Sequence, residues 1–428
     1  MRRWLETVAI YRDPRLVGIL FLGFSSGLPR GLVGATLAAW LTEAGVSMTA
    51  IGLVGMVAAF YSLKFLWAPV MDQVPVPFLT RRLGRRRSWT LVTQVGLVLS
   101  LLALGLENPA ADLTRTVALA IVVAICSASQ DIVIDAYRVE VLREEQYGAG
   151  AAMVQFGYNM AMLVTGFGSL YLAQFLSWYW VYPAAAALVT VGMITVLVNP
   201  EPPEHRPPVA AGRGVAAWLR TAVAAPFLDM VERQGWSVLL IFAFVLLYKV
   251  GDSFAGAAAT PFYLKIGFSK VDIANVSKLF GVAATIIGTM VGGAMVARLG
   301  IMRALLVCGV LQMLSNLTFA YLASVGAHLP TLYLAIAAEN VTGGMGSAAF
   351  VAYLSGLCNL TYTGTQYALL SSIGTLTRNT VAATWGGMVD HVGWVDFFLF
   401  TTVAALPGLI LLLWMMRRFP MARMSAAE

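Results

Sequence analysis

Two carboxylates, Asp131 and Asp135, lie four residues apart in the apolar segment TVALAIVVAICSASQDIVIDAYR, residues 116–138. One helical turn separates them, so they share a face of the predicted helix. A charge near the centre of a bilayer costs about 2.5–3.5 kcal/mol on insertion scales, and acids there face a protein interior or a water-filled path. The pair therefore predicts a proton or solute route, with Asp131 as the first candidate for carrying the proton. The alternative is a structural role beside basic residues at the helix end, where Asp135 lies close to Arg138.

Other charged residues fall inside apolar segments as well. Arg30 lies in FSSGLPRGLVGAT, where Gly and Pro loosen the helix, and LYKVGD places Lys249 and Asp252 on one face at i, i+3. Tyr248 is one turn from Asp252. Because Arg30 and Asp252 occupy equivalent places in the two halves of the chain, we expect them to approach across a central cavity. The alternative is an ion pair that only holds the halves together.

A third group of polar residues completes the candidate site. Glu339 and Asn340 precede a glycine cluster in AENVTGGMG, and Lys64 and Arg378 add buried positive charge. Basic residues that face a cavity suit an anionic substrate. Equally, Lys64 and Arg378 would serve to neutralise the membrane acids Asp131, Asp252 and Glu339.

A loop after the second apolar segment predicts a conformational latch. Asp72 is followed by RRLGRRR, which includes Arg85 and Arg86. An acid that caps this loop, with basic residues after it, holds neighbouring helices together by charge. We expect these residues to control conformation rather than to touch a substrate.

Composition shows which elements position these residues. The chain has 428 residues, of which 59% are hydrophobic and 11% charged, with a mean hydropathy of +0.78. A soluble domain carries about 25% charged residues, so the sequence predicts an all-α integral membrane protein. A spanning helix needs about 20 apolar residues. The expected spans are 16–40, 48–71, 88–106, 116–138, 148–172, 175–198, 236–263, 271–297, 302–324, 331–356, 363–388 and 394–416.

The net charge of +7 is a topology signal and does not indicate nucleic acid. If the spans alternate, nearly all arginines fall on one side, which the positive-inside rule makes cytoplasmic together with both termini. The three cysteines lie in or near spans, and neither they nor the three histidines suggest a disulfide framework, a metal site or a cofactor. No enzyme activity is predicted, because a clustered nucleophile or metal set is not found.

Weak internal repeats divide the chain into halves. AYRVEVLREEQYGAG resembles AYLSGLCNLTYTGTQ, WLTEAGVSMTAI resembles FYLKIGFSKVDI, and RRLGRR resembles ARLGIMR, in the same order and at a similar offset. We expect a six-helix bundle over 1–200, a cytoplasmic linker with an amphipathic segment over 201–235, and a second six-helix bundle over 236–428. Two such bundles in the same orientation are typical of the major facilitator fold.

Six segments carry a resemblance to a known family, in order: FLGFSSGLP, KFLWAPVMD, CSASQDIVIDAY, LYKVGD, ENVTGGMGSAAFVA and QYALLSS. Through them, the chain closely resembles the AmpG muropeptide permeases, a branch of the major facilitator superfamily. The resemblance runs from about residue 16 to 416. It implies proton-coupled import of N-acetylglucosaminyl-1,6-anhydro-N-acetylmuramyl peptides across the bacterial inner membrane for peptidoglycan recycling. In some bacteria it also implies an indirect part in β-lactamase induction. A related branch resembles acetyl-CoA transporters, so another anionic metabolite stays an alternative, as does drug export.

These expectations assign roles to the polar residues. Protonation of Asp131, or of Asp135 as second choice, removes a buried charge and lets the halves repack around the cargo; Asp252 and Glu339 are further candidates for proton coupling. Gln130, Asn340 and Gln366 suit sugar hydroxyl and acetamido groups. Arg30, Lys249 and Arg378 suit peptide carboxylates, with Lys64 and Tyr248 beside them. The expected partners are the sugar-peptide, protons and membrane lipids, and the expected state is a monomer.

Overall fold

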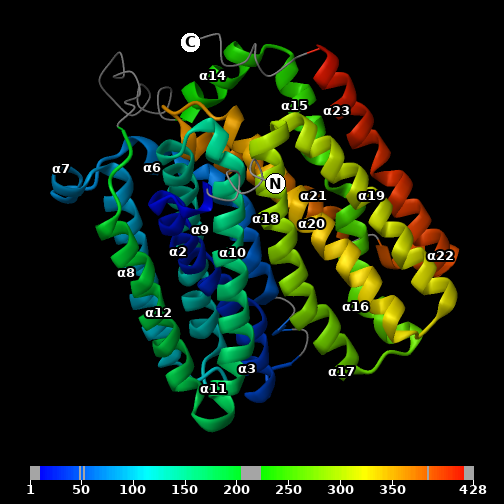
Figure 1. Ribbon diagram of the computed structural model, residues 1–428. Helices are drawn as coiled ribbons and strands as arrows, with labels where there is room; N and C mark the ends of the chain where they lie inside the picture. The colour runs from blue at the N-terminus through cyan, green and yellow to red at the C-terminus, as the bar shows by residue number, and fades with distance from the viewer. Residues whose placement is uncertain (1–9, 48–49, 52–53, 204–222, 383–384, 419–428) are drawn as a thin grey trace.

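The computed structural model describes residues 10–47, 50–51, 54–203, 223–382 and 385–418, and the architecture is helical (Figure 1). The first half contains α2 (Pro14–Gly31), α3 (Leu37–Glu43), α5 (Ala59–Leu63), α6 (Ala68–Gln73), α7 (Leu79–Leu83), α8 (Arg85–Gly105), α9 (Leu113–Val141), α10 (Tyr147–Leu163), α11 (Ser169–Phe175) and α12 (Trp178–Val198). The second contains α14 (Ala225–Gln234), α15 (Ser237–Leu247), α16 (Val250–Ile266), α17 (Lys270–Ile273), α18 (Gly281–Leu299), α19 (Ile301–Val325), α20 (Leu329–Leu357), α21 (Thr363–Ala382), α22 (Trp385–Ala404) and α23 (Leu406–Arg418).

Within the described residues, 8 helical stretches are long and apolar enough to cross a membrane. They coincide with the first, third, fourth, sixth, seventh, eighth, ninth and twelfth spans expected from the sequence. The other expected spans are also mostly helical, but they are broken or more polar. The second consists of short helical pieces around α5 and α6, while α10, α20 and α21 carry glycines and polar side chains. Polar and broken helices are tolerated at membrane depth where they line a cavity or are buried in protein.

Sequence features explain where the first helix begins and bends. Asp13 starts α2 by accepting a hydrogen bond from the backbone N–H of Arg15, and proline follows at the first helical position, as is favourable at helix N-termini. Beyond Arg30 the helix turns into a π-helical segment, Leu32–Thr36, in which Gly34 leaves helical geometry. Glycine permits such a departure at little steric cost. The sequence predicted the loosening at Gly27, Pro29 and Gly31, but α2 stays helical through Gly31 and the departure lies further along, at Gly34.

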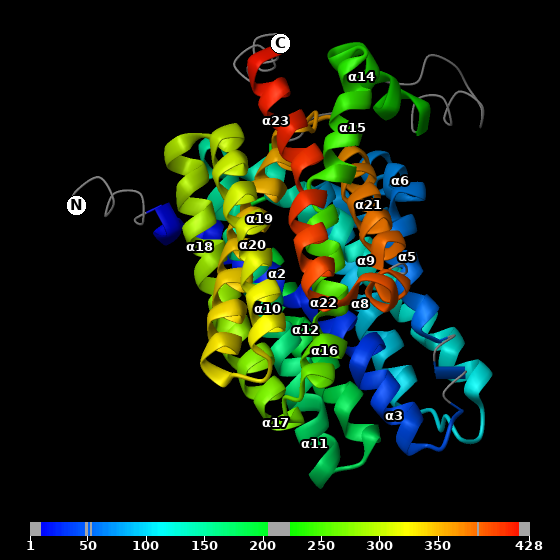
Figure 2. The same cartoon turned by 90° about the vertical axis from the view of Figure 1, so that its right-hand side faces the viewer.

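The two halves lie side by side (Figures 1 and 2). Each has its own apolar core, and a third apolar cluster contains buried residues of both. Helix α10 packs on α18 and α20, and α21 packs on α5, α6 and α9, so these helices form the seam between the halves. Close backbone approach at α10 and α18 depends on glycine: a Cβ at Gly148 would lie 2.8 Å from the carbonyl oxygen of Gly293. Small residues of this kind let membrane helices approach closely.

One end of the bundle carries the linker helix. Helix α14 lies at the same end as α6, α7 and the end of α23, whereas α3, α11 and α17 lie at the other (Figures 1 and 2). We call the first end the linker end. Residues 204–222, most of the predicted linker, are outside the described part of the chain.

Candidate functional site

A cavity of about 660 Å³ lies at the seam between the halves. Its walls come from α10, α16, α20 and α21, and its polar lining includes Gln155, Lys249, Asp252, Tyr367, Ser371 and Thr375. Volumes of about 300–1,000 Å³ are usual for small-molecule sites. Polar groups from both halves therefore surround one chamber of the size that a small molecule needs.

On the C-terminal side of the cavity, Lys249 is the centre of an acidic cluster. The residue lies at the break between α15 and α16, and its Nζ is 2.9 Å from Asp252 Oδ2 and 3.3 Å from Gln312 Oε1. The expected i, i+3 pair of Lys249 and Asp252 is thus confirmed. Glu339 on α20 is within electrostatic reach of Asp252 and Lys249, and its Oε2 accepts a hydrogen bond of 2.8 Å from Ser315 Oγ.

In the N-terminal half, Asp131 lies between α2 and α9. Its Oδ1 accepts a hydrogen bond of 2.5 Å from Ser26 Oγ. The Arg30 guanidinium lies 5.0 Å from the ring centroid of Tyr61, a cation–π distance. Both Arg30 and Lys64 are within electrostatic reach of Asp131, so two cations surround this acid.

Asp135 pairs with basic residues one turn further along α9. Its carboxylate oxygens lie 3.5 Å from Lys64 Nζ and 3.5 Å from Arg138 Nη2. Arg138 is fully buried and reaches the other half, where it donates to Ser355 Oγ at 3.0 Å and lies over the ring of Tyr367. The structural alternative for Asp135 is supported, because it orients an arginine that joins the halves.

The predicted latch is formed at the linker end and also joins the halves. Asp72 is completely buried, and its Oδ2 accepts hydrogen bonds from the backbone N–H and the hydroxyl of Thr365 at 2.6 and 2.7 Å. Its Oδ1 accepts from the N–H of Gly364 at 3.2 Å. A Cβ at position 364 would lie 2.7 Å from that oxygen, so the close approach requires glycine. An acid of α6 thereby caps the first turn of α21.

Basic residues of α8 hold Asp72 in place. Arg86 Nη2 lies 2.8 Å from Asp72 Oδ1 and 2.5 Å from Glu140 Oε1, and Arg85 donates to the carbonyl oxygen of Asp72. The backbone N–H groups of Arg86 and Arg87 donate to Glu201, whose carboxylate caps α8. Burial raises the pKa of Glu201 above its ordinary value, while these N–H groups act in the opposite direction.

The expected pairing of Arg30 with Asp252 across the cavity is wrong for this structure. Arg30 contacts Tyr61 in its own half, and Asp252 pairs with Lys249 in the other. The physical reason is proximity along the chain: a partner three residues away forms its pair at smaller entropic cost than one across a water-accessible chamber.

Two predicted substrate ligands, Tyr248 and Gln366, do not line the cavity and bond to neighbouring segments instead. Tyr248 stacks on Phe350 and donates to the carbonyl oxygen of Leu305. Gln366 is bonded to α14, donating to Pro226 O at 2.9 Å and Asp229 Oδ2 at 2.7 Å.

Two other predicted ligands lie within helix interfaces. Asn340 accepts from Thr285 Oγ1 at 2.8 Å and donates to Ile336 O, which joins α18 to α20. Gln130 is fully buried. The backbone of Arg378 belongs to α21, but its side chain lies outside the described part of the structure.

Several residues at these sites were not predicted. They are Gln155, Ser371 and Thr375 in the cavity, Ser355 and Tyr367 beneath Arg138, and Glu140, Gly364 and Thr365 at the latch. Gly364 and Thr365 of the latch had one signal in the sequence, because they lie in TYTGTQ, which resembles the EEQYGAG segment of the first half. Single polar residues such as Ser371 carried none.

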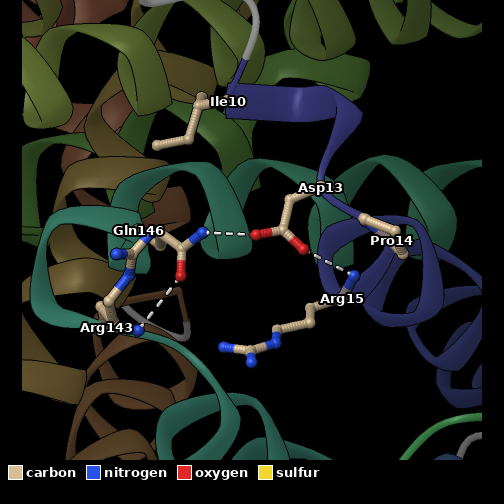
Figure 3. A pocket seen from close by; sticks show the side chains of 6 residues that line it. All are labelled: Ile10, Asp13, Pro14, Arg15, Arg143 and Gln146. Carbon is tan, nitrogen blue, oxygen red and sulfur yellow. Dashed lines mark hydrogen bonds between the residues drawn. The ribbon is translucent and has the colours of Figure 1, made fainter.

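A second hollow, of about 760 Å³, opens at the surface where η1 (Ile10–Arg12) meets the start of α10 (Figure 3). Asp13 accepts hydrogen bonds from two of its neighbours in this hollow: the Gln146 side chain donates to Oδ2 at 2.8 Å, and the backbone N–H of Arg15 donates to Oδ1 at 2.9 Å. The contact between Asp13 and Gln146 holds the start of α2 against the start of α10. We therefore assign the candidate site to the cavity between the halves.

Comparisons with known proteins agree with this arrangement. The sequence profile of the Major Facilitator Superfamily matches residues 19–376. The chain is 42% identical over 411 residues to the anhydromuropeptide permease of Escherichia coli (strain K12), which covers 95% of this chain and 81% of that protein.

Two solved structures share the fold at low sequence identity. The proton:xylose symporter XylE has a TM-score of 0.67 at 15% identity, covering 97% of this chain and 96% of XylE. The human organic anion transporter MFSD10 has a TM-score of 0.61 at 16% identity, covering 96% of this chain and 99% of MFSD10.

Proposed function

The chain belongs to the Major Facilitator Superfamily and, within it, to the anhydromuropeptide permease family, and we propose that it imports anhydromuropeptides in symport with protons. The observation that carries this proposal is the 42% identity to the Escherichia coli permease over 95% of the chain. The protein is a multi-pass membrane transporter and not an enzyme. Its location is proposed to be the bacterial inner membrane.

Transport proceeds by alternating access, with residues 1–200 and 236–428 as the moving halves and 201–235 as their connection. Asp72 with Thr365, and Arg138 with Ser355, tie the halves together at the linker end. The positive-inside rule assigns that end, with both termini, to the cytoplasm. With that orientation, we propose that the contacts at the linker end close the cavity toward the cytoplasm and that a cargo enters from the periplasm.

The cavity offers suitable groups for a sugar-peptide. Lys249 supplies a cation for a peptide carboxylate, and Gln155, Ser371 and Thr375 supply hydrogen bonds for hydroxyl and acetamido groups. Arg30 and Lys64 add positive charge in the N-terminal half, and Arg378 stays a proposed ligand. A single chain encloses the cavity, so we propose a monomer in contact with membrane lipids.

Proton coupling supplies the energy for accumulation. One proton moving down about 100 mV releases about 2.3 kcal/mol, enough for about fortyfold accumulation of a neutral cargo. The membrane acids Asp131, Asp135, Asp252 and Glu339 are the candidates for carrying that proton.

The test is uptake of radiolabelled anhydromuropeptide into proteoliposomes with an imposed proton gradient, with and without an uncoupler. We expect accumulation that the uncoupler abolishes, strong loss in Lys249→Gln, and near-normal uptake in Lys265→Gln, which removes an exposed lysine near the end of α16. Failure of the wild type to take up any anhydromuropeptide would contradict the proposal. Uptake of an acetyl-CoA-like anion, or outward drug flux, would instead support the alternatives.

A further inference from the structure

The acids and bases inside the membrane are not balanced equally in the two halves. In the N-terminal half, Asp131 and Asp135 have Lys64, Arg138 and Arg30 around them. Even without Arg138, which also bonds Ser355 in the other half, Lys64 and Arg30 match the two negative charges. The charges of Asp131 and Asp135 are therefore balanced by nearby cations without an added proton.

The C-terminal half has the opposite imbalance among its described side chains. Lys249 is the cation at this site, and Asp252 holds it at 2.9 Å. Glu339 has a neutral donor, Ser315 Oγ, at 2.8 Å. Burying a charge without a counter-charge is costly, and such a group neutralises instead. One proton on the pair of acids restores a net charge of zero.

The helices around Glu339 bring few other charges to it. Helix α19 contributes Ser315 and the amide of Gln312, and α18 contributes Thr285, which bonds the neighbouring Asn340. Helix α16 contributes Asp252 and Tyr263, and Lys249 lies directly before it. The side chains of Arg378 on α21 and Lys278 before α18 lie outside the described part.

We propose that Glu339 holds the coupled proton and that Lys249 transmits the presence of an anionic substrate to it. This inference rests on the proposed symport function, and it moves the proton from Asp131, the first candidate on sequence grounds, to the other half. Lys249 and Asp252 both line the cavity, and Glu339 is within electrostatic reach of both. Among the described side chains, Lys249 is therefore the cation that a substrate carboxylate and the acid pair must share.

Sharing this cation couples the two ligands. When a substrate carboxylate draws Lys249 Nζ into the cavity, Asp252 loses its counter-charge and the acid pair holds its proton more tightly. By linkage, the protonated pair leaves Lys249 freer to bind the carboxylate, so each ligand strengthens the other. The proton comes from water at the open end and returns to water at the opposite end, with no other bond made or broken.

The first experiment detects the proton without a substrate. The infrared C=O stretch of protonated carboxylic acid is recorded on purified protein near neutral pH. We expect a band in the wild type and in Asp131→Asn, and its loss in Glu339→Gln, which keeps an acceptor for Ser315. Asp252→Asn balances Lys249 against Glu339 and is also expected to remove the band. A band that disappears in Asp131→Asn, or persists unchanged in Glu339→Gln, would overturn the proposal.

The second experiment separates coupling from transport. Glu339→Gln in proteoliposomes is expected to exchange labelled for unlabelled anhydromuropeptide, but its uphill accumulation falls to a ratio of one and its substrate affinity loses pH dependence. Asp112→Asn, which removes the cap of α9 within one half, is the matched control and is expected to keep uphill accumulation. If the wild type accumulates substrate and Glu339→Gln does so equally, the assignment of the proton is wrong while the proposed function stands. If the wild type does not transport, the infrared result still decides the proton site.

Discussion

Replacing Asp72 by asparagine tests whether the latch closes the linker end. The carboxylate accepts from the N–H and hydroxyl of Thr365 and from the N–H of Gly364, all in the other half. Asparagine has the same shape but presents one NH₂ group, which cannot accept these hydrogen bonds. Arg86, which also bonds Asp72, keeps its partner Glu140, so the change acts mainly on the contact between the halves.

The structure allows an estimate of the effect. Hydrogen bonds to charged groups contribute about 1.5–3 kcal/mol each. The Thr365 hydroxyl can turn to accept from the new NH₂ group, so the certain loss is one bond from a backbone N–H, which removes at least about 1.5 kcal/mol from the closed state. Since 1.4 kcal/mol is a factor of ten, this shifts the equilibrium by at least about tenfold toward a state open at the linker end.

The native Cys358 thiol is a reporter for this shift. It lies at the end of α20, half-buried and within electrostatic reach of Arg138, close to the seam. In a background where Cys126 and Cys308 are replaced by alanine, we expect faster maleimide labelling of Cys358 in Asp72→Asn than with native Asp72. Asp112→Asn is the matched control, because Asp112 caps α9 within one half. Equal labelling rates in folded Asp72→Asn and the control would refute the reasoning.

Three further changes test other contacts. In Gly148→Val, the new Cβ would lie 2.5 Å from Val296 Cβ. Overpacking should therefore lower the free energy of unfolding, measured by thermal unfolding, by about 1–3 kcal/mol. Gln366→Leu removes hydrogen bonds to α14, including that to Asp229; faster hydrogen exchange in α14 is expected, with substrate binding unchanged. Because the pKa of Glu201 is raised, the folded state binds its proton more tightly than the unfolded state. Stability should therefore fall as pH rises from about 4.3, the ordinary glutamate value, through the raised pKa. Thermal melts across pH should show this fall in the wild type and not in Glu201→Gln.

Sequence predicted the fold and the local pairs well, because both depend on short-range patterns. The apolar segments gave the helices, and the i, i+3 spacing gave the contact between Lys249 and Asp252. Asp72 and its basic loop also followed from sequence order. The partners of Asp72 in the other half did not, since Gly364 and Thr365 act largely through backbone N–H groups, which every residue except proline has.

The predicted ligands that lie elsewhere share one physical cause. Gln366 and Tyr248 are polar residues in apolar segments, and such residues face either a cavity or a neighbouring helix. Only tertiary packing decides between these, and here α14 and the carbonyl of Leu305 supplied the partners. Arg30 was misassigned for a related reason, because Tyr61 in its own half was the nearer partner.

The first turns of α21 connect the latch, the linker and the cavity. Thr365 bonds Asp72, Gln366 bonds α14, and Tyr367 lies under Arg138 while also lining the cavity. Opening the linker end must break the contacts of Thr365 with Asp72 and of Tyr367 with Arg138, because these contacts join the two halves. Gln366 keeps its contacts with α14, because α14 directly precedes the half to which α21 belongs. A cargo that presses on Tyr367 therefore acts one helical turn or less from the latch. We therefore expect binding in the cavity to shift the equilibrium of the latch, because Tyr367 and Thr365 lie within one helical turn of α21.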